Sequence, residues 1–380
     1  MKKAVIINPT YNEKGNIEKL ITTLEEDIFP KIKDWDMYIL VADDSSPDGT
    51  GEEVKRLMEK YKNLDISVGE KHGLGAAYIR GMTYAIEKMD ADVVFEMDAD
   101  LQHDPEKIPL FLQKIDEGCD MVLGNRYSDG GSIPQNWPIQ RKVFSVVANL
   151  FVRIVFTAFS IHDWTGGYRA LKKEVFLKEK DKLTNFKGYI FQISFLHKAL
   201  RDGFKIGEVP FHFSDRTLGK SKIVPLSYIM EVFKYVVTAR LKELIFGSFG
   251  KFLVVGGIGF FLQLMVYRVM IRTTDFPLGL SSLIAAQLAI FSNYNLNNLW
   301  TFKKERANSV KQYFKRMLGF FASSNTGVLI IQSGLVQLGE VLFGRAYPLP
   351  YVYFVLATGV LLVYNFTMYR FVIWRRKPHK

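Results

Sequence analysis

Short apolar runs alternate with amphipathic segments over the first hundred residues. The apolar runs are four to eight residues long and rich in Val, Ile and Tyr, which is typical of strands. Nearly continuous apolar strands separated by helices indicate a mostly parallel sheet with helices on both faces. The strands are expected at 4–8, 37–43, 65–70 and 91–98, and the helices at 15–26, 50–62 and 75–88.

The last third of the chain has a different pattern. Residues 247–380 contain 15 basic and only three acidic side chains, which is too little polar surface to coat a soluble bundle of buried helices. Its apolar stretches are each close to or above the roughly 20 residues that a helix needs to cross a bilayer. We therefore predict a four-span transmembrane domain over 247–380, with spans at Phe252–Ile271, Phe276–Phe302, Met317–Gly339 and Ala346–Tyr369.

Basic residues mark one side of this domain. Six follow the second stretch and four follow the fourth, whereas Arg272 alone follows the first and Arg345 alone follows the third. By the positive-inside rule, residues 1–246 and both termini are expected in the cytosol, at the plasma membrane of a prokaryote. The five-residue apolar run before Pro9 is too short for the apolar core of a signal peptide.

Charge is unevenly distributed along the 380 residues. The net charge is +11, yet residues 1–120 hold 15 basic against 26 acidic side chains and residues 121–246 hold 20 against 10. A protein that coats nucleic acid would not concentrate its acid in one third of the chain, so no nucleic-acid partner is expected. The single cysteine, Cys119, excludes an intramolecular disulfide and a cysteine-based metal site.

Two amphipathic segments precede the transmembrane domain. Segment 141–160 carries basic residues on an apolar helix, and segment 223–246 places apolar residues at helical spacing opposite charged ones. Both patterns suit helices lying along a bilayer surface, although packing into the core is the alternative. We expect a catalytic domain over 1–225 and a juxtamembrane interfacial helix over 226–246.

Polar residues follow the predicted strands. In parallel sheets ligands bind at the carboxyl ends of the strands, and here those ends carry segments 8–13, 43–50 and 98–100. Alternation in an extended chain places Asp98 and Asp100 on the same side. Two such hard oxygen ligands suit Mg²⁺ or Mn²⁺ bridging a diphosphate, although Asp-x-Asp on its own is a common sequence.

Several motifs together resemble the nucleotide-sugar domain of family 2 glycosyltransferases, which has a GT-A fold. They are VIINPTYNE (5–13), LVADDSSPDGT (40–50) and FEMDADLQHDP (95–105). The segments GNRYSDGG (124–131), DWTGGYRA (163–170), EVPFHF (208–213) and DRTLGKSK (215–222) narrow the resemblance to polyprenyl-phosphate glycosyltransferases of the dolichyl-phosphate mannose synthase kind. The tail, with KFLVVGGIGFFLQ (251–263) and NYNLNNLWTF (293–302), resembles the GtrA-like four-helix membrane domain.

The resemblance implies a role for individual residues. The nucleoside would be wrapped by the first two motifs, the sugar diphosphate would lie on Asp98, Ala99 and Asp100, and Gln102 would be a third metal ligand beside the two aspartates. The phosphates would be held by Arg126, Arg216 and Lys222. The nucleoside set is Pro9, Tyr11, Glu13, Val41 and Asp43, and the catalytic set is Asp98, Asp100 and Arg126. For Asp44, capping a helix or a turn is as strongly favoured as binding the nucleoside.

The implied reaction is transfer of mannose from GDP-mannose to the phosphate of dolichyl (polyprenyl) phosphate at the cytosolic membrane face. The implied stereochemistry is inversion, and the implied cofactor is Mg²⁺ or Mn²⁺. A phosphate monoester carries about −1.5 to −2 charge near pH 7 and is already a nucleophile, so no strong general base is needed. Asp163 is a tempting base, but its turn-like context favours a structural role.

Three alternatives stay open. UDP-glucose is the second candidate donor, because nothing in Glu13 or Asp43 distinguishes guanine from uracil. A processive polysaccharide synthase is disfavoured because the chain lacks a Gln-x-x-Arg-Trp segment. A polyprenyl-lipid carrier or flippase with a nucleotide-binding domain is a third and weaker reading.

Overall fold

A computed structural model describes residues 1–183, 188–214, 226–276, 278–344, 346 and 348–375. The chain divides into two compact units, Met1–Thr238 and Ala239–Lys380. The predicted juxtamembrane helix thus contributes residues to both units.

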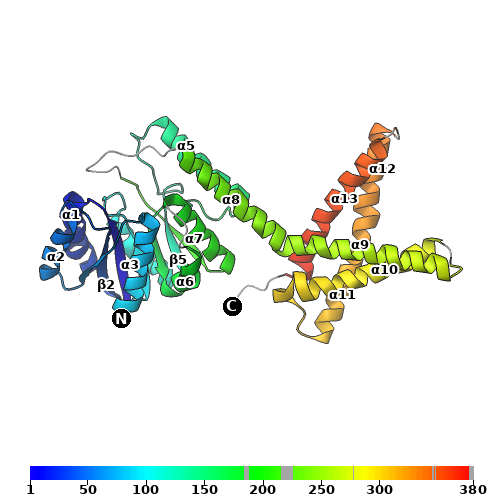
Figure 1. Cartoon of the computed structure of the whole chain (residues 1–380), viewed down its shortest axis with the longest axis horizontal. Coiled ribbons are helices and arrows are strands. Elements are labelled where there is room, and N and C mark those ends of the chain that lie inside the picture. The colour runs from blue at the N-terminus through cyan, green and yellow to red at the C-terminus, as the bar shows by residue number, and fades with distance from the viewer. Residues whose placement is uncertain (184–187, 215–225, 277, 345, 347, 376–380) are drawn as a thin grey trace. The chain divides into compact units, whose positions relative to one another are not determined.

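The first unit is built on a seven-stranded sheet of order β3-β2-β1-β4-β6-β5-β7 (Figure 1). Strands β1 to β4 are parallel to one another, and β6 runs antiparallel to both of its neighbours, β4 and β5. It follows that β5 and β7 run in the direction of β4. The strands are β1 (Lys2–Thr10), β2 (Trp35–Asp43), β3 (Leu64–Val68), β4 (Val93–Glu96), β5 (Met121–Asn125), β6 (Arg169–Lys172) and β7 (Ile206–Pro210).

Helices cover both faces of this sheet. Alternation along β1 points Ala4 and Ile6 to the face packed against α1, α2 and α4, and Ile7 to the face packed against α3. Helices α6 and α7 pack against each other, and α7 also contacts α3. The helices of this unit are α1 (Lys14–Thr22), α2 (Thr50–Lys60), α3 (Leu74–Met89), α4 (Ile108–Asp116), α5 (Ile139–Phe156), α6 (Lys173–Glu179), α7 (Gly188–Asp202) and most of α8 (Leu226–Phe246).

The predicted α/β architecture is confirmed. All four strands and three helices expected in the first hundred residues are present, with ends shifted by a few residues. Strands β5, β6 and β7 were not predicted as strands, although each overlaps one of the motifs that carry the family resemblance. Each of them is only four or five residues long, so no apolar run stands out against the surrounding loops.

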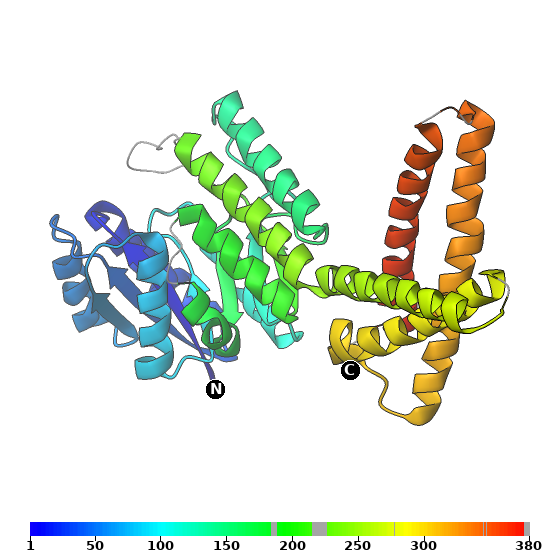
Figure 2. The ribbon, with the colours of Figure 1, turned by 45° about the vertical axis from the view of Figure 1, so that its right-hand side comes forward.

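Helices α5 and α8 lie side by side in both ribbon views (Figures 1 and 2). The Phe151 and Phe233 rings stack between them, with centroids 5.1 Å apart. Both helices leave large apolar side chains exposed. On α5 these are Ile139, Val143, Phe144, Val146, Val147, Leu150 and Ile154, and on α8 they are Met230, Phe233, Leu241, Ile245 and Phe246.

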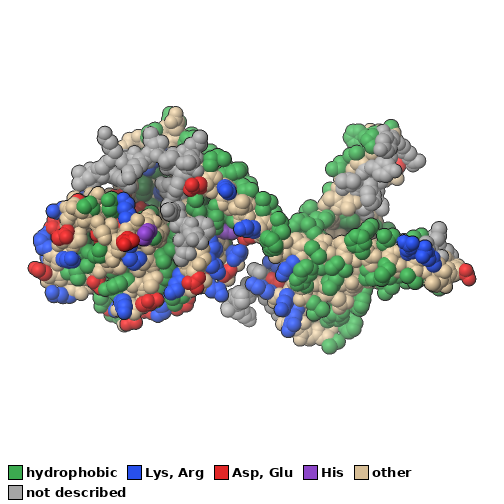
Figure 3. All heavy atoms as spheres, in the orientation of Figure 1, with side chains coloured by type: hydrophobic (Ala, Val, Ile, Leu, Met, Phe, Trp, Pro, Cys, Tyr) green, Lys and Arg blue, Asp and Glu red, His purple; other side chains and the backbone are tan. Residues whose placement is uncertain are grey.

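The second unit is helical, and hydrophobic side chains dominate its visible face (Figure 3). The four predicted spans fall on its helical segments, but the number of membrane crossings stays a prediction. Two described stretches, Ile229–Met270 and Leu356–Ile373, have the length and hydropathy of a membrane span. The helices are α9 (Ser248–Thr273), α10 (Leu278–Leu296), α11 (Val310–Thr326), α12 (Ser333–Phe343) and α13 (Leu349–Met368), and the short helical segment Gly327–Gln332 continues α11 into α12.

An aromatic cluster holds one end of this second unit together. The Trp374 ring is fully buried, stacks on Phe302 at 4.8 Å between centroids, and donates its Nε1–H to Asn298 Oδ1 at 3.1 Å. The cluster also includes Tyr294 and Phe320. This hydrogen bond joins segments that are 76 residues apart, which gives Asn298 an interhelical role.

We predict that Gly81→Ala lowers stability, although alanine is about 1 kcal/mol better than glycine inside a helix. A Cβ at Gly81 of α3 would lie 2.6 Å from Ile7 Cγ2 and 3.4 Å from Ala42 Cβ, so the helix has to move off the sheet. We expect a loss of about 1–3 kcal/mol. Thermal or denaturant unfolding of the full chain in detergent measures it.

Gly51→Ala in α2 is the matched control. A Cβ there would meet nothing closer than 3.8 Å, so stability should be unchanged or slightly higher. A Gly81→Ala protein as stable as this control would contradict the close approach of α3 to β1.

Candidate active site

The carboxyl ends of β1, β2, β4 and β5 share one edge of the sheet because these strands run in the same direction. The segment after β4 carries Asp98 and Asp100, and Arg126 directly follows β5. Strand topology therefore brings the acidic motif and the predicted phosphate-binding arginine to the same edge. Such an edge is where α/β sheets bind ligands.

Asp43 ties the first two loops of this edge together. Its Oδ1 accepts hydrogen bonds from Thr10 Oγ1 at 2.7 Å and Ser46 Oγ at 2.6 Å, and its Oδ2 accepts from Ser46 N at 2.9 Å. Asp44 forms an ion pair with Arg80 at 2.9 Å. Asp43 thus shapes the loop that was expected to hold a nucleoside, and Asp44 anchors the same loop to α3.

The other predicted nucleoside residues lie on or beside β1 and β2. Tyr11 is 40% exposed, and Lys71 Nζ lies over its ring at 3.1 Å from the centroid. Glu13 accepts a hydrogen bond from Asn16 Nδ2 at 2.8 Å, and Pro9 is half-buried. Val41 is fully buried in the sheet core between β1 and β3, so its side chain is out of reach of a ligand.

Asp98, Ala99 and Asp100 form the turn that follows β4. The Asp98 side chain is one third exposed, whereas Ala99 and Asp100 are buried. Asp100 Oδ1 accepts the backbone N–H of Gln102 at 3.2 Å. The Gln102 amide donates from Nε2 to Ser214 O at 3.0 Å, so this predicted ligand is linked to the segment after β7.

Two buried residues orient Asp98. Tyr78 of α3 donates its hydroxyl to Asp98 Oδ1 at 2.9 Å. Burial and the charge of Asp98 raise the pKa of Tyr78 well above its usual value, so the phenol keeps the proton that it donates. His103 Nδ1 accepts the Asp98 backbone N–H at 3.1 Å, and its Nε2 lies 4.0 Å from Asp98 Oδ2.

His103 is held neutral. Burial lowers its pKa to about 4, with Asp100 raising that pKa and Arg126 lowering it further. Because Nδ1 accepts a backbone N–H, the imidazole proton sits on Nε2, on the side of Asp98. The ring stacks on Tyr168 at 4.8 Å between centroids, which fixes its plane.

Two fully buried ionisable residues lie on the strands beside this turn. Glu96 of β4 is the register partner of Arg169 of β6, and both are fully buried. Burial raises the pKa of Glu96 to about 7, and Arg169 only partly offsets that rise. Arg169 donates to the carbonyls of Gly166 and Gln192, at 3.0 and 2.9 Å.

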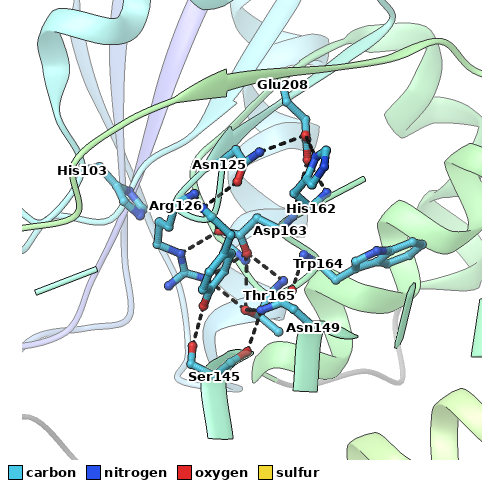
Figure 4. A network of polar contacts seen from close by, with 12 residues as sticks. His103, Asn125, Arg126, Ser145, Asn149, His162, Asp163, Trp164, Thr165 and Glu208 are labelled. Carbon is cyan, nitrogen blue, oxygen red and sulfur yellow. Dashed lines mark hydrogen bonds and ion pairs between the residues drawn. The ribbon is translucent and has the colours of Figure 1, made fainter. Parts of the chain in front are cut away.

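Arg126 is locked in a bidentate ion pair with Asp163 (Figure 4). Its Nε donates to Asp163 Oδ2 at 2.7 Å and its Nη2 to Oδ1 at 2.9 Å, with both side chains nearly or fully buried. Nη2 also donates to Thr165 Oγ1 at 2.9 Å. The side chain of Arg126, which was predicted to bind phosphate, is therefore fixed in orientation. The contacts of Asp163 agree with the structural role expected for it.

The charge state of Asp163 follows from the same contacts. Burial by itself would raise its pKa, but the charge of Arg126 and the hydrogen bonds from Arg126 and the Gly166 N–H bring the pKa below its ordinary value. The carboxylate therefore stays ionised beside Arg126. A carboxylate with a lowered pKa and these contacts is a poor general base.

A second layer of contacts surrounds this pair (Figure 4). Asn149 of α5 accepts a hydrogen bond from the backbone N–H of Trp164 at 2.7 Å, and the Tyr127 hydroxyl is hydrogen-bonded to Ser145 Oγ. Glu208 of β7 accepts from Asn125 Nδ2 at 2.9 Å and from the His162 N–H at 2.7 Å. The turn that holds Asp163 is thus fastened to α5 and to β7.

A divalent cation fits the turn after β4. The described residues contain no group of three or more His, Cys, Asp or Glu side chains that could hold a metal by themselves. Mg²⁺, however, is commonly bound by one or two carboxylates together with substrate phosphates. Asp98 supplies a partly exposed carboxylate already oriented by Tyr78, which suits a cation that arrives with a diphosphate.

Arg216 and Lys222 lie outside the described residues. Tyr78, His103, Thr165 and Asn149 were missed as site residues, because each joins the site through a contact distant in the sequence or by stacking. His103 had one available signal, since it lies inside the quoted FEMDADLQHDP motif. Tyr78 is 20 residues from Asp98 on a different element, and nothing in the sequence pairs the two.

Comparison with protein families gives two matches. The glycosyl transferase family 2 model matches residues 5–179, and the "GtrA/DPMS, transmembrane domain" model matches residues 251–374. The first match contains the site described above, from β1 to Asp163. The second contains the helices of the second unit, so the chain is a membrane protein.

Two relatives and one group of solved structures are similar to the chain. It is 38% identical to the polyprenol monophosphomannose synthase of Mycolicibacterium smegmatis over 224 residues, covering 58% of this chain and 81% of the relative. It is 34% identical to the dolichol-phosphate mannosyltransferase of Pyrococcus furiosus over 336 residues, covering 87% of this chain and 88% of the relative.

Crystal structures of the Mycobacterium tuberculosis glucosyl-3-phosphoglycerate synthase, one of them in a complex with Mn²⁺ and UDP, align with a TM-score of 0.43 and 18% identity. That alignment covers 64% of this chain and 79% of the other, and it is too weak to support an inference. The two relatives and the matched models decide the assignment. The chain belongs to glycosyltransferase family 2, in the dolichyl-phosphate mannose synthase group, with a GtrA/DPMS transmembrane domain at residues 251–374.

Proposed function

We propose that this protein transfers mannose from GDP-mannose to the phosphate of a dolichyl or other polyprenyl phosphate, with inversion, at the cytosolic face of the membrane. The observation that carries the proposal is the shared sheet edge, where Asp98 and Asp100 follow β4 and the buried Arg126 follows β5. The names of the two relatives support mannose as the sugar and a polyprenyl phosphate as the acceptor.

The donor would occupy the loops after β1, β2 and β4. The network of Asp43, Thr10 and Ser46 gives the nucleoside loop a fixed shape before ligand arrives. Fixed loops reduce the entropy lost on binding. Asp98, Asp100 and Gln102 are the residues that would hold Mg²⁺ or Mn²⁺, and that ion would neutralise charge on the diphosphate leaving group.

The acceptor needs little chemical activation. An oxygen of the lipid phosphate attacks the anomeric carbon of mannose from the side opposite the diphosphate, the bond from that carbon to the diphosphate oxygen breaks, and GDP leaves. The site has to hold two anions close together, which calls for a fixed cation. Arg126 is such a cation, because Asp163 fixes its orientation.

Helices α5 and α8 would bring this site to the bilayer. Both expose apolar side chains, and Phe151 and Phe233 pack them together. Helix α8 is separated from α9 of the transmembrane domain by Gly247 alone. This chain continuity supports a lipid surface as the occupant of the apolar faces, because α8 leads directly into the membrane.

The proposed reaction predicts label in the lipid phase. Detergent-purified protein is incubated with dolichyl phosphate, Mn²⁺ or Mg²⁺, and labelled GDP-mannose or UDP-glucose in parallel. We expect metal-dependent lipid label from GDP-mannose. Label from UDP-glucose alone would contradict GDP-mannose as the donor but would leave the proposed mechanism in place. If neither donor labels the lipid although the protein still binds nucleotide, the proposed transfer is contradicted.

Asp100→Ala is expected to lower transfer by at least about 100-fold, the order of loss for an electrostatic group that acts on the leaving charge. Its fold should persist, because the hydrogen bond from the Gln102 N–H lies within the turn after β4 and the pairing of β4 with β1 and β6 does not use this side chain. Asp27→Asn is the control. It replaces an exposed acid between α1 and β2, and it should keep full activity. Equal activity of the two variants would remove Asp100 from the site.

Tyr78→Phe is expected to weaken Mn²⁺ binding by roughly tenfold in the presence of nucleotide, because Asp98 loses the donor that orients it. Electron paramagnetic resonance of free and bound Mn²⁺ measures this directly, without turnover. The matched control is Tyr84→Phe on the same helix, whose hydroxyl donates to Asp65 instead. Unchanged Mn²⁺ affinity in Tyr78→Phe would contradict metal binding at Asp98.

A further inference from the structure

Helix α5 has two faces with different tasks. Residues at helical spacing on its outer face, including Val143, Val147, Leu150 and Ile154, are 47–53% exposed. Asn149 lies on the opposite face and is only 3% exposed, together with the buried Val152 and Phe156. A buried amide on an otherwise apolar helix face needs hydrogen-bond partners, and the partners of Asn149 belong to the active site.

Asn149 uses both ends of its amide on the turn that holds Asp163. Its Oδ1 accepts the Trp164 N–H at 2.7 Å, and its Nδ2 donates to Ser145 O at 2.9 Å and lies 3.4 Å from Thr165 Oγ1. The same Thr165 hydroxyl accepts from Arg126 Nη2 at 2.9 Å. In Figure 4 the Asn149 and Ser145 side chains of α5 lie beside this turn.

A second contact joins α5 to Tyr127, the neighbour of Arg126 in the chain. The Ser145 hydroxyl, one helical turn before Asn149, is hydrogen-bonded to the hydroxyl of Tyr127, the residue that follows Arg126. Helix α5 therefore contacts the residue next to Arg126 and also the Trp164–Thr165 turn, whose Thr165 hydroxyl accepts a hydrogen bond from Arg126. If α5 moves relative to the sheet, these contacts must move with it or break.

We propose that Asn149 is a positioning residue that couples the placement of α5 on the membrane to the orientation of Arg126. The inference rests on the proposed function, since it takes the outer face of α5 as the bilayer contact. Docking α5 on the bilayer presses the Asn149 face toward the Trp164–Thr165 turn and holds the guanidinium beside Asp163. The arginine is then ready to hold phosphate when the enzyme is at the surface that contains its lipid substrate.

The alternative is that Asn149 only closes the buried end of a loop. In that case its removal would lower stability and weaken every substrate alike. The two roles differ in which kinetic parameter changes. Coupling to Arg126 affects transfer to the lipid phosphate and leaves binding of the nucleotide at the β1, β2 and β4 loops intact.

The test uses the full chain in phosphatidylcholine–phosphatidylglycerol vesicles containing dolichyl phosphate. We expect Asn149→Ala to lower kcat/KM for dolichyl phosphate by roughly 10- to 100-fold, the order of loss when a reacting group is displaced by about 1 Å. Affinity for GDP, measured by calorimetry with Mn²⁺, should change less than about twofold. Gln140→Ala, at an exposed polar residue on the same helix, is the control and should match the wild type.

Three further variants separate positioning from folding. Asn149→Asp keeps an acceptor for the backbone N–H of Trp164 and removes the amide donor, so it should lose transfer; because it also buries a second carboxyl group near Asp163, its unfolding temperature is measured beside that of Asn149→Ala. Thr165→Val removes the hydroxyl shared by Asn149 and Arg126, so the Asn149→Ala/Thr165→Val double variant should be no worse than the worse single variant. Val147→Asp on the outer face should lower kcat/KM for dolichyl phosphate when it is the only substitution. It should cause little further loss when it is combined with Asn149→Ala.

Additive losses in the double variants would overturn the coupling, as would a parallel loss of GDP affinity in Asn149→Ala or wild-type transfer by Asn149→Asp. The proposed function is tested separately by the wild-type protein in the same vesicles. If the wild type transfers no sugar to dolichyl phosphate, the proposed function fails. If the wild type transfers and Asn149→Ala matches it, only the coupling fails.

Discussion

The bidentate pair between Arg126 and Asp163 is the contact on which the active site depends. An arginine that follows a sheet strand would ordinarily turn toward solvent, but here Asp163 takes two of its nitrogens out of water. Removing one partner of such a buried pair typically costs about 3–5 kcal/mol, because the other charge is left unpaired. The turn from Asp163 to Gly166, α5 and β7 are arranged around this pair, and together they fix a positive charge at the acidic edge of the sheet.

The acidic side of the edge is organised in the same manner. Asp98 is oriented by the protonated Tyr78 and lies beside a neutral His103. The Asp43 carboxylate accepts hydrogen bonds from Thr10 and Ser46 and so links the loops that follow β1 and β2. A site with oriented carboxylates on one side and a fixed arginine on the other matches the needs of a reaction between two anions.

The hydrophobic pattern predicted the first half of the sheet because β1 to β4 are apolar runs followed by recognisable loops. It did not predict β6, which lies between β4 and β5 and is antiparallel to both. Because of β6, β5 runs in the same direction as β4, and Arg126 therefore lies at the same edge of the sheet as Asp98. Asp98 and Asp100 were found from their position at the end of a predicted strand, whereas Arg126 and the individual roles came from family resemblance. The partners that orient them were not predicted, since Tyr78 and Asp163 lie 20 and 37 residues away from the groups they hold, and only the tertiary fold brings them together.

We propose that this edge of the sheet binds the sugar nucleotide together with a divalent ion that Asp98 and Asp100 would hold. A structure of the full chain with Mn²⁺ and GDP-mannose, with the metal located by anomalous scattering, tests it most directly. The account predicts an anomalous peak on a carboxylate oxygen of Asp98 or Asp100, with Arg126 still paired to Asp163. A metal bound elsewhere, or an Arg126 released from Asp163 to follow the donor, would contradict it.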